Sequence, residues 1–106
     1  MSKGMGFGNI VKQAQELQER LAKVQEEAAS RTVEASAGGG MVTAVVNGRG
    51  ELVSIKIDPE IVKAGDIPML EDLVLAAVNE ARSRSEELMR DAMNRVAGPF
   101  GGFPFV

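Results

Sequence analysis

Apolar residues recur every three or four positions along the first third of the chain. Between residues 9 and 30 they are spaced four, three, four, three and four apart, at Ile10, Ala14, Leu17, Leu21, Val24 and Ala28. This heptad-like spacing predicts a helix of about 33 Å that packs through one narrow seam. Glu16 precedes Arg20, and Glu19 precedes Lys23, by four residues, an order that favours ion pairs on the exposed faces. Residues 1–8 show no such period, and we expect a flexible leader there.

An alternating pattern follows the helix and predicts three short strands. Apolar and polar residues alternate over residues 33–37 and again over residues 52–57, and a β-branched run covers residues 41–46. Two glycine-rich segments, Gly38-Gly39-Gly40 and Asn47-Gly48-Arg49-Gly50, separate the three runs. Glycine and asparagine tolerate the positive φ angles of tight turns. Two short connections in succession predict a three-stranded antiparallel meander.

Helix signals return after the third strand. Asp58 and Pro59 are typical of a helix cap and first position, so they predict a short helical turn. Asp66 and Pro68 begin a second long helix, which we expect to end near Val96 because Gly98-Pro99 follows. Its second half carries a narrow apolar strip that could pair with the seam of the first helix. The strip consists of Ala81, Leu88, Ala92 and Val96.

The first half of this second helix is apolar on nearly all sides. Residues 73–78 read Leu-Val-Leu-Ala-Ala-Val and leave no polar face. A helix of this kind must be covered from more than one direction, and one three-stranded sheet has a single inner face. We therefore expect a homodimer in which the helices lie between two sheets. The predicted dimer core consists of Leu70, Leu73, Val74, Ala77 and Val78.

Composition narrows the possible functions. The chain has 106 residues, 44% hydrophobic and 25% charged, which fits a single domain over residues 1–106 with a flexible tail at 98–106. It has no cysteine and no histidine, so thiol chemistry, imidazole ligands and the usual proton shuttle are excluded. We therefore expect no enzymatic activity, cofactor, metal or small-molecule substrate. No stretch reaches a membrane-spanning length, and the expected compartment is the cytoplasm.

The net charge of −3 is unevenly distributed along the chain. Residues 1–24 hold four basic and two acidic side chains. Residues 51–80 hold two basic and seven acidic side chains, and residues 81–106 hold four basic and three acidic ones. The two ends are thus mildly basic around an acidic middle. A local basic surface can attract phosphates despite an acidic total, with strong salt dependence.

Three segments resemble the YbaB/EbfC family of nucleoid-associated proteins. They are V-E-A-S-A-G-G-G-M-V-T-A-V-V-N-G (33–48), I-K-I-D-P-E (55–60) and M-L-E-D-L-V-L-A-A-V-N-E-A (69–81). The resemblance spans roughly residues 9–97. It implies an α+β protomer of order α-β-β-β-α, an intertwined dimer with a tweezers-like outline, and DNA binding at the nucleoid with little sequence preference.

Charge and placement on the two long helices select the candidate DNA-binding residues. These are Lys3, Lys12, Arg20, Lys23, Arg82, Arg84, Arg90 and Arg95. For each one alone, solvation of a helical face is at least as good an explanation. The chain has four Phe and no Tyr or Trp, so we expect phosphate contact rather than base stacking. The competing hypothesis is a protein adaptor whose helical arms dock on a replication or repair protein.

Overall fold

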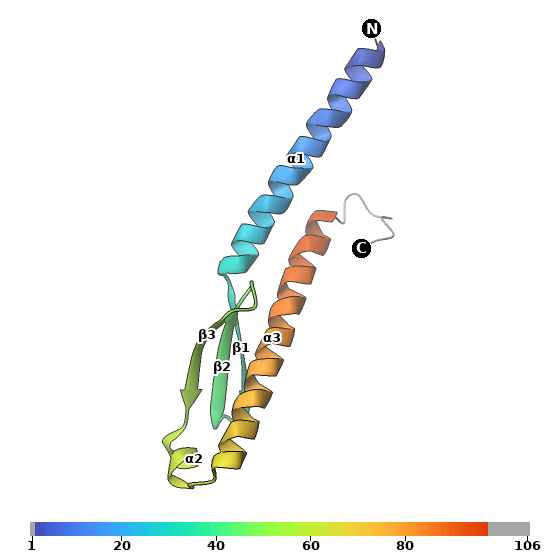
Figure 1. Cartoon of the computed structure of the whole chain (residues 1–106). Helices are drawn as coiled ribbons and strands as arrows, with labels where there is room; N and C mark the ends of the chain where they lie inside the picture. The colour runs from blue at the N-terminus through green and yellow to red at the C-terminus, as the bar shows by residue number, and fades with distance from the viewer. Residues whose placement is uncertain (1, 98–106) are drawn as a thin grey trace.

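The computed structural model describes the backbone of residues 2–97 and the side chains of residues 6–96. The chain is elongated, with extents of 77 × 23 × 16 Å (Figure 1). Its elements in order are α1 (Ser2–Ser30), β1 (Thr32–Ala37), β2 (Val42–Asn47), β3 (Leu52–Ile57), α2 (Pro59–Lys63) and α3 (Ile67–Ala97). The predicted α-β-β-β-α order and the α+β class are confirmed. The predicted tail at 98–106 lies outside the described residues.

The three strands form an antiparallel meander in the order β1-β2-β3, as predicted. Gly38, Gly39 and Gly40 join the first two strands with φ angles of +64°, +67° and +97°, which side chains rarely adopt. A bulge lies between Val45 and Val46 on β2, where the register with β3 shifts. The shift leaves one extra residue on β3, so the alternation predicted for that strand is interrupted near its start.

α3 packs on the inner face of β1 and β2 and contacts β3 much less. The buried cluster contains Ala35, Val42, Ala44 and Val46 from the sheet and Ala77 and Ala81 from α3. Alanines on both sides let the helix approach the strands closely, and the β-branched valines fill the space between them. One face of β1 and β2 is thereby covered, while the same face of β3 is left largely open.

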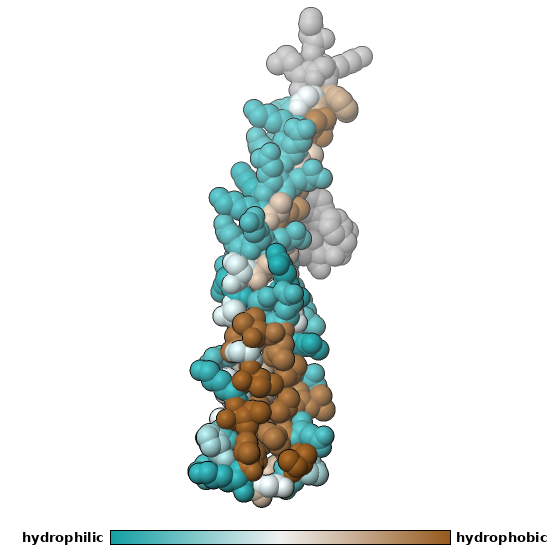
Figure 2. Space-filling model, turned by 60° about the vertical axis from the view of Figure 1, so that its left-hand side comes forward, coloured by the Kyte–Doolittle hydropathy of each residue, from teal (hydrophilic) through white to brown (hydrophobic). Residues whose placement is uncertain are grey.

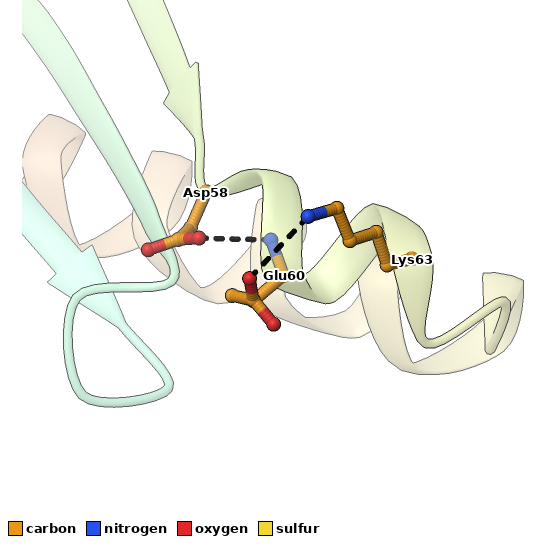
Figure 3. Close-up of polar contacts among 3 residues, drawn as sticks. All are labelled: Asp58, Glu60 and Lys63. Atoms are coloured by element: carbon orange, nitrogen blue, oxygen red, sulfur yellow. Dashed lines mark hydrogen bonds and ion pairs between the residues drawn. The ribbon is translucent and has the colours of Figure 1, made fainter.

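The short helix α2 forms where the Asp-Pro pair predicts it. Asp58 is the N-cap, and its carboxylate accepts a hydrogen bond of 2.8 Å from the Glu60 backbone N–H (Figure 3). Lys63 lies 3.7 Å from the Glu60 carboxylate one turn later. Ile61 points inward and is buried, so this turn closes the end of the sheet.

α1 begins at Ser2, which corrects the prediction that residues 1–8 form a leader without regular structure. Gly4, Gly6 and Gly8 lower helix propensity by about 1 kcal/mol each relative to alanine. They do not forbid a helix, and no proline interrupts the segment. The helix is therefore about two turns longer at its N-terminus than the periodicity indicates.

The seam of α1 pairs with α3 along only part of its length. Val24 and Ala28 of α1 lie beside Ala92 and Val96 of α3, so the predicted pairing of the two narrow strips is confirmed there. The N-terminal part of α1 extends past the end of α3 (Figure 1). Ile10 on this projecting part is 64% exposed. Within residues 2–97, neither long helix is apolar enough over a sufficient length to cross a bilayer.

Candidate nucleic-acid interface

α1 carries three of the predicted basic residues on one side. Lys12, Arg20 and Lys23 are exposed and lie within about 80° of one another around the helix axis. The apolar seam of α1 lies on the opposite side, so packing against α3 leaves these cations in solvent. Glu16 lies on the same side and reduces the local positive potential. Lys3 also belongs to α1, but its side chain lies outside the described residues.

The ion pairs expected on α1 do not form. Neither Glu16–Arg20 nor Glu19–Lys23 is within bonding distance, and the ion pairs among the described residues lie elsewhere. Long exposed side chains gain little from pairing in water and lose rotamer freedom, which accounts for the difference. The basic groups of α1 are therefore available to an external anion.

Arg84 differs from the other arginines of α3. Its Nη1 donates a 2.7 Å hydrogen bond to the Glu34 carbonyl oxygen on β1, and its Nε lies 3.5 Å from the Glu80 carboxylate. The first contact ties the helix to the edge strand β1, and the second is an i,i+4 pair within α3. Arg84 thus has two partners inside the protomer before any ligand arrives.

The remaining arginines of α3 fall into two places. Arg82 and Arg90 line a groove beside the β2–β3 turn, and the same groove includes Arg49 from that turn. Arg95 lies at the α1–α3 junction with Arg31, which also lines that second pocket. The structure therefore brings predicted residues together with two arginines that the sequence did not single out.

The sequence offered little reason to select Arg49. It lies in a turn, isolated from other basic residues, and Arg82 is more than thirty positions away along the chain. Only the return of the β2–β3 hairpin against the middle of α3 makes them neighbours. An arginine inside a glycine-flanked turn is the one local signal that could have drawn attention, because such turns are exposed.

The β2–β3 turn is held firmly against both long helices. The Ser85 hydroxyl of α3, which is 1% exposed, donates a 2.6 Å hydrogen bond to the Asn47 carbonyl oxygen. The Asn47 side chain accepts hydrogen bonds from the Arg49 and Glu51 backbone N–H groups, at 2.9 and 3.1 Å. Gly48 lies so close to α1 that a β-carbon would overlap the Ala28 carbonyl. Arg49 therefore projects from a fixed backbone.

The sheet half of the molecule carries a broad apolar surface on one side (Figure 2). Exposed apolar side chains of this half come from β3, α2 and α3 and are Leu52, Val53, Ile57, Val62, Ile67, Met69 and Leu75. Leu75 precedes Arg82 by seven residues, about two helical turns, so it lies on the flank of α3 that faces β3. We call the surface formed by Val53, Ile57 and Leu75 the apolar face.

The predicted dimer-core residues divide into two groups in the single chain. Ala77 has no exposed surface, because it packs in the protomer core. The other four are half-buried and pack around that core, namely Leu70, Leu73, Val74 and Val78. In the sheet half, the most exposed large apolar side chains, such as Leu75 at 61%, are thus neighbours of the predicted set rather than members of it.

A model of the YbaB/EbfC DNA-binding family matches residues 3–100. The chain belongs to this family. Its relatives include nucleoid-associated proteins of Thermodesulfovibrio yellowstonii, 60% identical over 100 residues, and of Thermoanaerobacter pseudethanolicus, 54% identical over 95 residues. The first match covers 94% of this chain and 87% of the relative, and the second covers 90% and 86%. The resemblance seen in the sequence is confirmed.

A solved structure of the same fold supports the architecture. An uncharacterized protein from Helicobacter pylori superposes with a TM-score of 0.70, covering 90% of this chain and 97% of that one. Its sequence is 23% identical, so this likeness concerns the fold alone. The YbaB/EbfC match includes both long helices and the β2–β3 turn, so every cluster of arginines described above lies inside the family domain.

Proposed function

We propose that this chain is a non-enzymatic nucleoid-associated protein that binds duplex DNA as a homodimer in the cytoplasm. Binding is mainly to backbone phosphates and has little sequence specificity. It would organise the nucleoid and thereby affect gene expression. Membership of the YbaB/EbfC DNA-binding family is the observation that carries this proposal, and the distribution of charge agrees with it.

The positive charge lies where a long duplex can reach it. The basic side of α1 is exposed along a projecting helix, and Arg82 and Arg90 are exposed on the adjoining part of α3. Seven of the fifteen acidic residues lie between positions 51 and 80, around β3, α2 and the start of α3. DNA approaching the sheet end would be repelled, so the field orients the duplex toward the helical end.

Phosphate contact is the mode of binding that these side chains support. Arginine and lysine donate hydrogen bonds to phosphate oxygens whatever the base sequence. Stacking on bases requires aromatic platforms, and the only aromatic residue among positions 6–96 is Phe7. We therefore expect similar affinity for duplexes of unrelated sequence.

The apolar face supports the homodimer. Leu75 is 61% exposed, and β3 lacks the helix cover that β1 and β2 have. Contiguous exposed apolar surface of this kind marks interaction sites on proteins of this size. A second copy placed against it would cover β3 and the flank of α3 at once. Dimerisation would also double the number of phosphate-contacting cations.

The basic side of α1 is tested by replacing Lys12, Arg20 and Lys23 together with Gln. This change keeps side-chain length and helix propensity and removes three charges per chain. We expect weaker binding to every duplex and a shallower slope of log affinity against log salt, by about 0.9 for each phosphate that the variant no longer neutralises. Fluorescence anisotropy with random-sequence duplexes over a salt series measures both quantities.

Thermal unfolding of the triple variant serves as the control for helix stability. A folded variant with unchanged affinity and an unchanged salt slope would show that α1 is not part of the DNA surface. Failure of the wild-type protein to bind duplex DNA at low salt would remove the proposed function itself.

A second candidate function is a protein adaptor that docks on a replication or repair protein. The observation in its favour is the projecting part of α1, where Phe7 and Ile10 are 71% and 64% exposed. An apolar seam without cover suits a partner helix. The salt series separates the two functions, because phosphate contacts weaken steeply with salt whereas apolar docking does not.

A further inference from the structure

A groove of roughly 500 Å³ lies between the β2–β3 turn and the middle of α3. Three arginines line it, Arg49 from the turn and Arg82 and Arg90 from the helix. Glu86 is the only acidic residue among its lining residues, so the groove carries a net positive charge of two. A site with this charge selects an anion.

The two helical arginines line the groove at two levels along α3. Arg82 and Arg90 are eight residues apart, which is about 12 Å of helix. Arg49 approaches from the turn, so the guanidinium groups come from two separate elements. Within residues 6–96, none of the three takes part in an ion pair. Each of them keeps its donors for a ligand.

The turn offers side chains, not backbone amides, to that ligand. The Gly48 N–H donates to the Arg31 carbonyl, and the Gly50 N–H donates to the Asn47 carbonyl, at 2.9 and 3.0 Å. The Arg49 N–H is bonded to the Asn47 side chain. All three amides are thus satisfied internally, and the guanidinium groups are left as the donors. A guanidinium group can donate two parallel hydrogen bonds to two oxygens of one phosphate.

The floor of the groove is apolar. Met89 and Met93 lie one and two turns after Ser85 on the same side of α3, and both are half-buried. A surface that joins cationic donors to a small apolar floor is complementary to a phosphodiester next to its sugar. Free phosphate would use the cations alone. The combination therefore favours a nucleic-acid backbone over an inorganic anion.

We propose that this groove binds a backbone phosphate of duplex DNA, with Arg49 as the residue that completes the site. The inference rests on the proposed function and adds to it a specific place of contact at the β2–β3 turn. Arg82 and Arg90 contact the same strand from α3. Ser85 acts as a positioning residue, because it holds the turn that carries Arg49.

The test compares Arg49→Gln with Lys56→Gln in the full chain. Both variants remove one positive charge, but Lys56 pairs with Thr43 on the face of the sheet away from α3. The factor that one phosphate contact contributes to the association constant varies with the salt concentration to the power of about −0.9. The loss of duplex affinity caused by Arg49→Gln should therefore be about eightfold greater at 0.1 M salt than at 1 M salt. Lys56→Gln should leave affinity and salt slope unchanged.

A third variant, Glu86→Gln, should act in the opposite direction. It removes the carboxylate from the groove and should strengthen duplex binding and steepen the salt slope. If the wild-type protein binds duplex DNA and the two variants Arg49→Gln and Lys56→Gln bind it with equal affinity, the inference is overturned. The proposed function would then still stand. No duplex binding by the wild-type protein would instead remove the proposed function.

Two further measurements identify other uses of the groove. Titration calorimetry with inorganic phosphate should show no binding below millimolar concentration. Micromolar binding that Arg49→Gln abolishes, with duplex affinity unchanged, would overturn the inference in favour of a free-anion site. A change in molar mass by light scattering in Arg49→Gln would also overturn it, because the groove would then belong to a subunit contact.

Discussion

Ser85 is the one polar side chain that is fully buried within residues 6–96. Its hydroxyl donates to the Asn47 carbonyl oxygen and so joins the middle of α3 to the end of β2. On sequence alone, it is an ordinary serine among the charged residues of a helix. Its position opposite the turn makes it the link between the fold and the arginine groove.

Replacing Ser85 with Ala should destabilise the protein by about 1 kcal/mol, the usual net value of one hydrogen bond. The loss stays modest because the Gly50 N–H also donates to the same Asn47 carbonyl, which is therefore not left unpaired. Urea unfolding measures the free energy. The matched control is Ser83→Ala at an exposed position of the same helix, which should change stability by less than about 0.5 kcal/mol.

Equal stabilities of the two serine variants would show that the Ser85 hydrogen bond does not form in solution. Amide hydrogen exchange of the turn gives an independent readout. Protection of the Arg49 and Gly50 amides should fall in Ser85→Ala and stay unchanged in Ser83→Ala, because only the first change releases the turn from α3.

α1 changes its environment along its length. Its C-terminal part packs on α3 and includes Ala28 and Ala29, which are buried, whereas its first turns extend beyond α3 (Figure 1). A helix without tertiary contacts depends on propensity and charge alone. The N-terminal extension found in the structure is therefore the part of α1 that is most sensitive to glycine.

Gly8→Ala tests that extension. Nothing lies within 4 Å of a β-carbon placed at Gly8, so the substitution meets no steric obstacle. It should stabilise the local helix by about 0.5–1 kcal/mol and increase amide protection around Ile10. Hydrogen exchange followed by NMR measures this effect residue by residue.

Gly39→Ala is the contrasting control. Gly39 also has open space around it, but its φ angle of +67° strains any other residue. This variant should lose stability where Gly8→Ala gains it. Unchanged protection near Ile10 in Gly8→Ala would indicate that residues 2–8 are not helical in solution.

At the scale of the whole molecule, the apolar and the basic surfaces occupy opposite ends. The apolar face lies at the sheet end, and the basic side of α1 lies on the projecting helix (Figures 1 and 2). Such a division lets a second copy join at one end while both helical ends remain accessible. The proposed dimer and the proposed DNA surface are therefore compatible in one assembly.

Leu75→Glu tests the dimer without disturbing the protomer. Because Leu75 is mostly exposed, the charge should not unfold the chain, yet two like charges would meet across the proposed interface. We expect a monomer for this variant and a dimer for the wild type at micromolar concentration, measured by light scattering. Ile10→Glu, at a similarly exposed position on α1, should remain dimeric.

Val78→Asp gives the complementary result. Val78 is half-buried against the protomer core, so an unpaired charge there should cost several kcal/mol and leave insoluble or unfolded protein. A soluble, folded wild-type monomer at micromolar concentration would contradict the dimer. A dimeric Leu75→Glu variant would move the interface away from the apolar face.

Local signals in the sequence specify the order of the elements and most of their bounds. The hydrophobic period, the turn glycines and the Asp-Pro cap are local signals, because each affects the conformation of residues only a few positions away. The same is true of the basic side of α1, since residues on one helix keep fixed angles to one another. The excess of apolar residues in α3 likewise indicated that one sheet is too little cover, and Leu75 is indeed left exposed.

Which distant residues meet depends on how the elements pack against one another. Arg49 lies beside Arg82 because the β2–β3 hairpin returns against α3, and Arg84 is held by Glu34 because α3 crosses β1. Ala77 is buried for the same reason. These juxtapositions depend on how a helix packs across a sheet, which is a long-range outcome. The hydrophobic period of the sequence cannot specify it, because the period shows which side of an element is apolar and not which partner covers that side.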